Sequence, residues 1–133
     1  RIERTFLDKI MAVKRHAIGG TLSGKVRHIY DITRLYSMDE LQQFLNNKIE
    51  LKKLLQTTKS TDSFYLEKRK SNNDYNPLER YDFSSWEKLL DQQIKRQYEN
   101  LHVDLLYTNE KQDFYHALEV LHKINLIFLE IDE

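Results

Sequence analysis

Four charged residues in the first third of the chain have the types and spacing that could bind a triphosphate. Lys9 lies in a helical pattern, beside its apolar stripe rather than within it. Arg27, Asp31 and Arg34 stand at positions i, i+4 and i+7, so they share one face of a second helix. Cations bind phosphate, and a carboxylate can take a metal ion, a sugar hydroxyl or a proton. By spacing alone, an ordinary surface ion pair between Arg27 and Asp31 is the simpler interpretation.

A glycine-rich segment lies between these two helical patterns and has the spacing of the start of a phosphate-binding loop. In residues 19–25 two glycines are separated by four residues and the second is followed by lysine, but Val26 stands where a magnesium-binding serine or threonine is needed. The preceding residues 14–18 are charged rather than typical of a buried strand. We therefore predict a turn between helices. No metal site is predicted. Three histidines in the second half of the chain lack the spacing of metal ligands: His102, His116 and His122.

The scarcity of turn residues indicates the fold class. The sequence has 133 residues, of which only three are glycine and one is proline. A sandwich or barrel with many tight hairpins needs more of both. We predict an all-α fold in a single domain, residues 1–133.

Composition and charge exclude several classes of protein. The absence of cysteine excludes a disulfide framework and a thiolate zinc site. The 21 basic and 21 acidic side chains balance, which is not typical of a wholesale basic nucleic-acid binder. No apolar run approaches the roughly 20 residues of a membrane span. We expect a cytoplasmic protein with no membrane partner.

The charge is unevenly distributed along the chain. Residues 1–36 carry eight basic and three acidic side chains, and the rest carry thirteen basic and eighteen acidic ones. The difference fits either chance among solvated helix faces or an anion-binding first third.

Apolar periodicity predicts about five helices to position these residues. They span about 5–16, 25–36, 37–55 with a break at residues 46–47, 84–101 and 109–128, and the last two are expected to form an antiparallel hairpin. Residues 57–82 are polar and turn-rich, so an irregular connection is expected there, within which residues 64–68 could form a short helix. Polar residues are the expected N-terminal caps of four helices: Thr5, Ser37, Ser84 and Asn109.

Two segments of the first third resemble a known family. Residues 3–13 read ERTFLDKIMAV, and residues 27–35 read RHIYDITRL. They resemble the C-terminal part of the AbiEii/AbiGii nucleotidyltransferase toxins, which belong to type IV toxin–antitoxin and abortive-infection systems. Asp8 and Lys9 match the family's Glu-Lys pair, and Arg27 through Leu35 match its Arg-His-x-Tyr-Asp-x-x-Arg-Leu motif. The resemblance covers residues 3–36.

The resemblance implies a polymerase β-like nucleotidyltransferase that moves a nucleotide from an NTP to an acceptor, with tRNA favoured. Lys9 and Asp31 would be catalytic, and Lys9, Arg27 and Arg34 would bind the nucleotide. The parent enzyme would use Mg²⁺ and NTP, and its partner would be a cognate antitoxin. In this family an N-terminal α/β domain supplies an Asp-x-Asp metal pair, which this sequence lacks. The chain is therefore expected to be a helical C-terminal fragment that is inactive alone.

Two other functions remain open. A non-catalytic helical module could bind a protein partner through apolar helix faces, which would explain the missing metal motif. Alternatively, the basic first third could bind tRNA or another nucleic acid by itself, and such binding would weaken steeply with added salt.

Overall fold

The computed structural model describes residues 1–69, 74–104 and 109–132 of the chain. These residues form α-helices and 3-10 turns without any β-strand, which confirms the predicted all-α class. The elements in chain order are α1 (Ile2–Ile18), α2 (Arg27–Tyr36), α3 (Asp39–Asn46), α4 (Lys48–Arg69), the 3-10 turns η1 (Phe83–Ser85) and η2 (Glu87–Leu89), α5 (Gln92–Glu99), α6 (Leu101–Asp104) and α7 (Phe114–Ile131).

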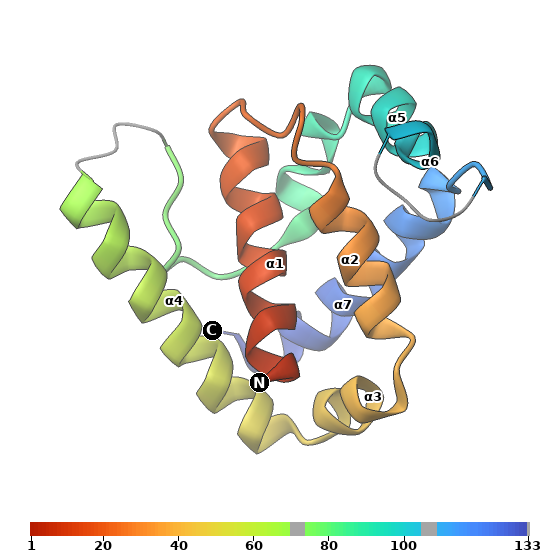
Figure 1. The fold of residues 1–133 in the computed structure, drawn as a ribbon. Helices are drawn as coiled ribbons and strands as arrows, with labels where there is room; N and C mark the ends of the chain where they lie inside the picture. The colour runs from red at the N-terminus through yellow and green to blue at the C-terminus, as the bar shows by residue number, and fades with distance from the viewer. Residues whose placement is uncertain (70–73, 105–108, 133) are drawn as a thin grey trace.

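Helix α1 lies at the centre of the molecule and contacts helices on both sides. Figure 1 shows α2 running back beside α1, α4 along its other flank and α7 behind them. Helix α3 follows α2 and packs on α4, while α5 lies near the connection between α1 and α2. This arrangement places the two segments that carry the charged residues, α1 and α2, next to each other.

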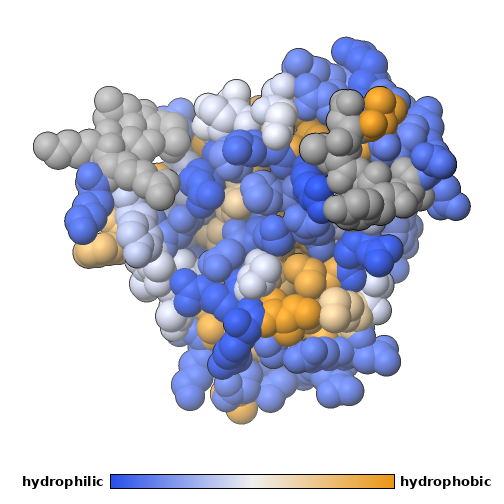
Figure 2. Space-filling model, in the orientation of Figure 1, coloured by the Kyte–Doolittle hydropathy of each residue, from blue (hydrophilic) through white to orange (hydrophobic). Residues whose placement is uncertain are grey.

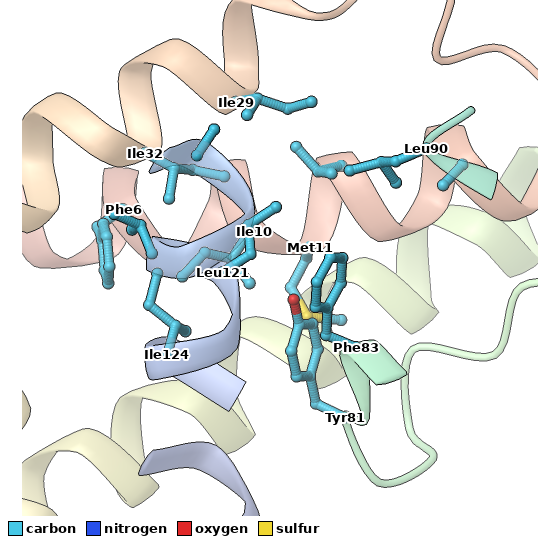
Figure 3. Close-up of a cluster of buried hydrophobic side chains, with 14 of the residues drawn as sticks. Phe6, Ile10, Met11, Ile29, Ile32, Tyr81, Phe83, Leu90, Leu121 and Ile124 are labelled. Carbon is cyan, nitrogen blue, oxygen red and sulfur yellow. The ribbon is translucent and has the colours of Figure 1, made fainter. Parts of the chain in front are cut away.

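The core is built from the apolar stripes that the periodicity predicts. On α1, Phe6, Ile10 and Val13 are completely buried. Figure 3 shows Phe6 and Ile10 meeting side chains of α2 and α7, with Tyr81 and Phe83 packed at one edge. The partners that α2 and α7 contribute are also buried: Ile29, Ile32, Leu121, Ile124 and Phe128. Among the described residues, no helix is both long and apolar enough to cross a membrane.

A buried network of charged groups joins the end of α7 to the rest of the fold. The Asp132 carboxylate accepts hydrogen bonds from the Lys59 ammonium on α4 and from the Tyr81 backbone N–H. The Lys59 ammonium also donates to the Glu79 carbonyl oxygen at 2.8 Å. Nearby, the Lys14 ammonium pairs with the Glu79 carboxylate at 3.0 Å. We call Lys14, Lys59, Glu79, Tyr81 and Asp132 the C-terminal network.

The predicted caps of α1 and α3 are wrong, because α1 begins before Thr5 and because Ser37 ends the preceding helix α2. Helix α1 begins at Ile2, so Thr5 lies inside it, and the Thr5 hydroxyl donates to the Arg1 carbonyl oxygen. Ser37 has helical backbone angles and ends α2, where its hydroxyl donates to the Arg34 carbonyl oxygen. Helix α3 then follows Met38, and the predicted break at residues 46–47 separates it from α4 as expected.

The prediction of an irregular connection over 57–82 is wrong for its first half, because α4 continues to Arg69. Two polar residues of this part are buried, Thr58 and Lys59. The Thr58 hydroxyl donates to the Leu54 carbonyl oxygen, and the Lys59 ammonium joins the C-terminal network. Since their polar groups are satisfied, these residues extend a helix that hydropathy alone ends too early. Residues 70–73 lie outside the described residues.

The predicted helix over 84–101 is divided into short elements. Asp82 caps η1 by accepting from the Ser84 N–H, and Asp91 caps α5 by accepting from the Ile94 N–H. Two aromatic side chains of this segment are buried: Phe83, which begins η1, and Trp86, which lies between the two 3-10 turns. The expected long first arm of an antiparallel hairpin is therefore absent.

The second arm of that hairpin forms but starts later than predicted. Its cap is Asp113, whose carboxylate accepts from the His116 N–H, and not Asn109.

Candidate functional site

Lys9 and Asp31 meet across the contact between α1 and α2. The Lys9 ammonium donates to the Asp31 carboxylate with a distance of 3.0 Å between Nζ and Oδ2. Each side chain is 25% exposed, so water and a small ligand can reach both groups. Residues 22 positions apart in the sequence are thus paired because α2 runs back along α1.

The two predicted arginines occupy different places around this pair. Arg27 lies one helical turn before Asp31, and 3.9 Å separates its Nε from Asp31 Oδ1. Both carboxylate oxygens of Asp31 therefore face cations. Arg34 points instead toward the Tyr30 ring, with its guanidinium carbon 6.0 Å from the ring centre. The structure brings Lys9, Asp31 and Arg27 together and leaves Arg34 at the edge of the group.

Two histidines that the sequence analysis did not select lie on the same contact between the helices. The His16 ring of α1 stacks against the His28 ring of α2, with ring centres 6.0 Å apart and planes inclined by 14°. His16 Nδ1 lies 2.8 Å from the Thr21 hydroxyl oxygen. Sequence spacing could have indicated them, because His16 and Lys9 are two helical turns apart and His28 is next to Arg27. We call Lys9, His16, Arg27, His28 and Asp31 the α1–α2 seam.

The seam carries two cationic side chains, Lys9 and Arg27, against one carboxylate, Asp31. Burial lowers the pKa of His28 first, and the positive charges of Lys9 and Lys25 lower it further, against the opposite effect of Asp31. Burial likewise lowers the pKa of His16, followed by the charges of Arg15, His28 and Lys25. Because the positive charges of Lys9 and Arg27 outnumber the single negative charge of Asp31, a ligand that brings negative charge would be favoured at the seam. Hydrophilic residues cover much of this side of the molecule over α1 and α2 (Figure 2).

The residues of the seam suit phosphate better than a metal ion. Asp31 is its only carboxylate, and each of its oxygens already faces a cation. Over the described ranges, no three histidine, aspartate or glutamate side chains are grouped so that they could hold a metal ion. Mg²⁺ prefers several oxygen ligands at close range. The seam by itself therefore offers Mg²⁺ a single carboxylate that is already paired with cations.

Comparisons with known proteins do not assign the chain to a family. No protein-family model matches the sequence, no curated protein matches it, and no solved structure matches the fold. The family suggested by residues 3–36 stays a prediction, and a function has to be inferred from the geometry of the seam.

Proposed function

We propose that the chain is the helical part of a nucleotidyltransferase toxin of the AbiEii/AbiGii type. The enzyme would move a nucleotide from an NTP to an acceptor, with tRNA as the expected acceptor and a cognate antitoxin as its partner. Its Asp-x-Asp metal pair and Mg²⁺ would belong to an N-terminal α/β domain that is not part of this sequence. The helical part alone is then expected to be inactive.

The pairing of Lys9 with Asp31 is the observation that carries this proposal. A lysine and an aspartate that the resemblance assigns to one cleft come from separate helices and lie 3.0 Å apart. Their exposure of 25% each leaves both groups accessible. The Arg27 guanidinium adds a second positive charge beside the pair, which favours a polyanionic ligand.

The chemistry assigns a different role to each group. In nucleotidyl transfer an acceptor hydroxyl attacks the α-phosphorus, the bond to the β-phosphate breaks, and pyrophosphate leaves. Lys9 would neutralise the negative charge that gathers on the leaving pyrophosphate. Asp31 would orient the acceptor or the nucleotide, or accept the hydroxyl proton. Arg27 and Arg34 would supply supporting positive charge to the phosphates.

The test is nucleotide transfer by the parent protein. Its reading frame upstream of Arg1 should encode a glycine-rich motif followed by Asp-x-Asp. In that full-length protein, Lys9→Ala and Asp31→Asn should each abolish incorporation of labelled nucleotide into tRNA, while circular dichroism shows a folded protein. Lys52→Ala is the matched control, because it removes an exposed lysine on α4 and should leave incorporation unchanged. Wild-type turnover by either seam variant would contradict the assigned residues.

A non-catalytic interaction module is the second candidate. Several large apolar side chains are at least half exposed on α4, α6 and α7, and a protein partner could cover them: Ile49, Phe64, Val103, Tyr115 and Leu126. A thermal-shift experiment with Mg²⁺ and each NTP separates the two candidates. Stabilisation that Lys9→Ala removes favours the nucleotidyltransferase, whereas an upstream sequence without an Asp-x-Asp motif favours the module.

A further inference from the structure

A groove of about 470 Å³ lies between the start of α2 and the end of α5, beside the α1–α2 seam. Figure 1 shows α5 next to the connection that leads from α1 into α2. Arg27 belongs to both places, because it lines the groove and also lies 3.9 Å from Asp31. The other lining residues are Ser23, Gly24, Val26, Arg96, Gln97, Asn100 and Leu101.

Among the residues that the structure describes, the rim of the groove carries two guanidinium groups and no acidic side chain. Arg27 and Arg96 line it from different helices, and none of the lining residues is an aspartate or glutamate. The Arg27 side chain is 48% exposed, and Arg96 is also exposed. No carboxylate among the described residues forms an ion pair with Arg96. Guanidinium groups form paired hydrogen bonds with phosphate oxygens, so this rim suits a phosphate.

The loop that forms one wall of the groove, residues 23–24, is held to α5 by two hydrogen bonds with the side-chain amide of Gln97. Gln97 accepts a hydrogen bond from the Gly24 N–H at 3.2 Å and donates one to the Ser23 hydroxyl oxygen at 2.8 Å. Because the Ser23 oxygen is the acceptor, its own proton is available to a ligand. Gly24 has a φ of +82°, a conformation that glycine adopts without strain. The wall is thus held in place before any ligand binds, which lowers the entropic cost of binding.

The floor of the groove is apolar. Val26 and Leu101 line it, and each is only 4% exposed. An apolar floor under a cationic rim matches the two halves of a nucleotide, whose base has apolar faces and whose phosphate is charged. The volume also falls within the range of roughly 300–1,000 Å³ that small-molecule sites occupy.

We propose that this groove binds one nucleotide unit. Arg27 and Arg96 contact its phosphate, the Ser23 hydroxyl donates to a phosphate oxygen, and the base or sugar lies over Val26 and Leu101. The unit is either a free nucleotide or one residue of a single-stranded RNA. This inference shares Arg27 with the proposed function but goes beyond it, since the ligand lies outside the Lys9–Asp31 pair and its binding requires no catalysis.

The experiment measures binding of two probes to this chain and to four variants. The probes are AMP, followed by calorimetry, and a short fluorescein-labelled single-stranded RNA with no terminal phosphate, followed by fluorescence anisotropy. Arg96→Gln should weaken binding about tenfold, the loss expected for one charge-assisted contact. Arg96→Lys should weaken it less, because the charge remains. Lys52→Gln removes an equal charge from α4 and should have little effect, and Lys9→Gln tests the seam separately.

Each outcome decides the proposal. Weaker binding of both probes by Arg96→Gln supports a phosphate site that free nucleotides reach. Weaker binding of the RNA alone supports a site for the backbone of a strand. Equal effects of Arg96→Gln and Lys52→Gln, or no binding of either probe, would overturn the groove as a nucleotide site. A loss with Lys9→Gln but not with Arg96→Gln overturns the groove and leaves the proposed function intact.

Discussion

Two lysine–aspartate pairs of this fold use the same chemical groups in different surroundings. In the C-terminal network, the Lys59 and Asp132 side chains are 6% and 8% exposed. In the α1–α2 seam, the Lys9 and Asp31 side chains are 25% exposed each. The buried pair has further hydrogen-bond partners in the Glu79 carbonyl and the Tyr81 N–H. The seam pair also faces the Arg27 guanidinium, 3.9 Å from Asp31.

This difference in exposure indicates which pair can bind a ligand. Removing charges from water is costly, so a buried pair persists only when its remaining hydrogen bonds are satisfied, and its partners cannot be exchanged without unfolding. The accessible pair can exchange its partner for a phosphate at little cost to the fold. We therefore assign a structural role to the C-terminal network and expect ligand binding at the seam.

The largest expected effect comes from breaking the buried pair. Asp132→Asn leaves the Lys59 ammonium without a counter-charge in a buried site, and it should reduce the free energy of unfolding by about 3–5 kcal/mol. Chemical denaturation monitored by circular dichroism measures this loss. Glu79→Gln should also be costly, because it removes the counter-charge of the Lys14 ammonium, whose side chain is 2% exposed. A loss for Asp132→Asn no larger than that for Lys9→Gln at the seam would contradict the contrast.

A smaller effect is expected when the seam pair is broken. Lys9→Gln should change the free energy of unfolding by about 1 kcal/mol or less, because the pair is accessible to water and to ions. The same denaturation experiment measures it, and added salt should reduce the difference between variant and wild type. A loss as large as that of Asp132→Asn would mean that Lys9 is needed for folding, which would remove the basis for a ligand-binding seam.

The smallest expected effect is a change of stability with pH. Because burial lowers the pKa of His16 and His28 below 6.5, the folded protein favours their neutral forms. The unfolded chain then binds more protons, so this contribution to stability is complete above pH 6.5 and is lost as pH falls through the lowered pKa values. The charges that face the pair are those of Lys9, Arg15, Lys25 and Asp31.

Thermal unfolding between pH 7 and pH 5 measures this dependence, in a range that begins just above the ordinary histidine pKa of about 6.5. The double variant His16→Gln/His28→Gln should lose part of the decline in Tm that wild type shows. His116→Gln, which changes an exposed histidine on α7, is the control and should keep it. Equal declines in Tm for wild type, the double variant and the control would contradict the assignment of this pH dependence to His16 and His28.

Local sequence signals predicted the helices whose apolar stripes are continuous. The stripe of Phe6, Ile10 and Val13 identified α1, and that of Leu121, Ile124 and Phe128 identified α7. The predicted ends were less accurate: Thr5 has the right type for a cap but lies inside α1, and Ser37 ends α2 instead of beginning α3. A cap signal depends on the type of one residue, whereas an apolar stripe is supported by the burial of several residues.

The sequence by itself determined the all-α class, the two charged helix faces and the turn between them. Helical periodicity does this, since it places residues on a face without any knowledge of the partner helix. Only the tertiary structure decided that Lys9 reaches Asp31, that His16 stacks on His28, and that Lys59 is buried. These contacts join distant parts of the chain, and they depend on how α1 packs against α2 and α4. Packing is a property of pairs of helices, so the pattern within one helix does not specify it.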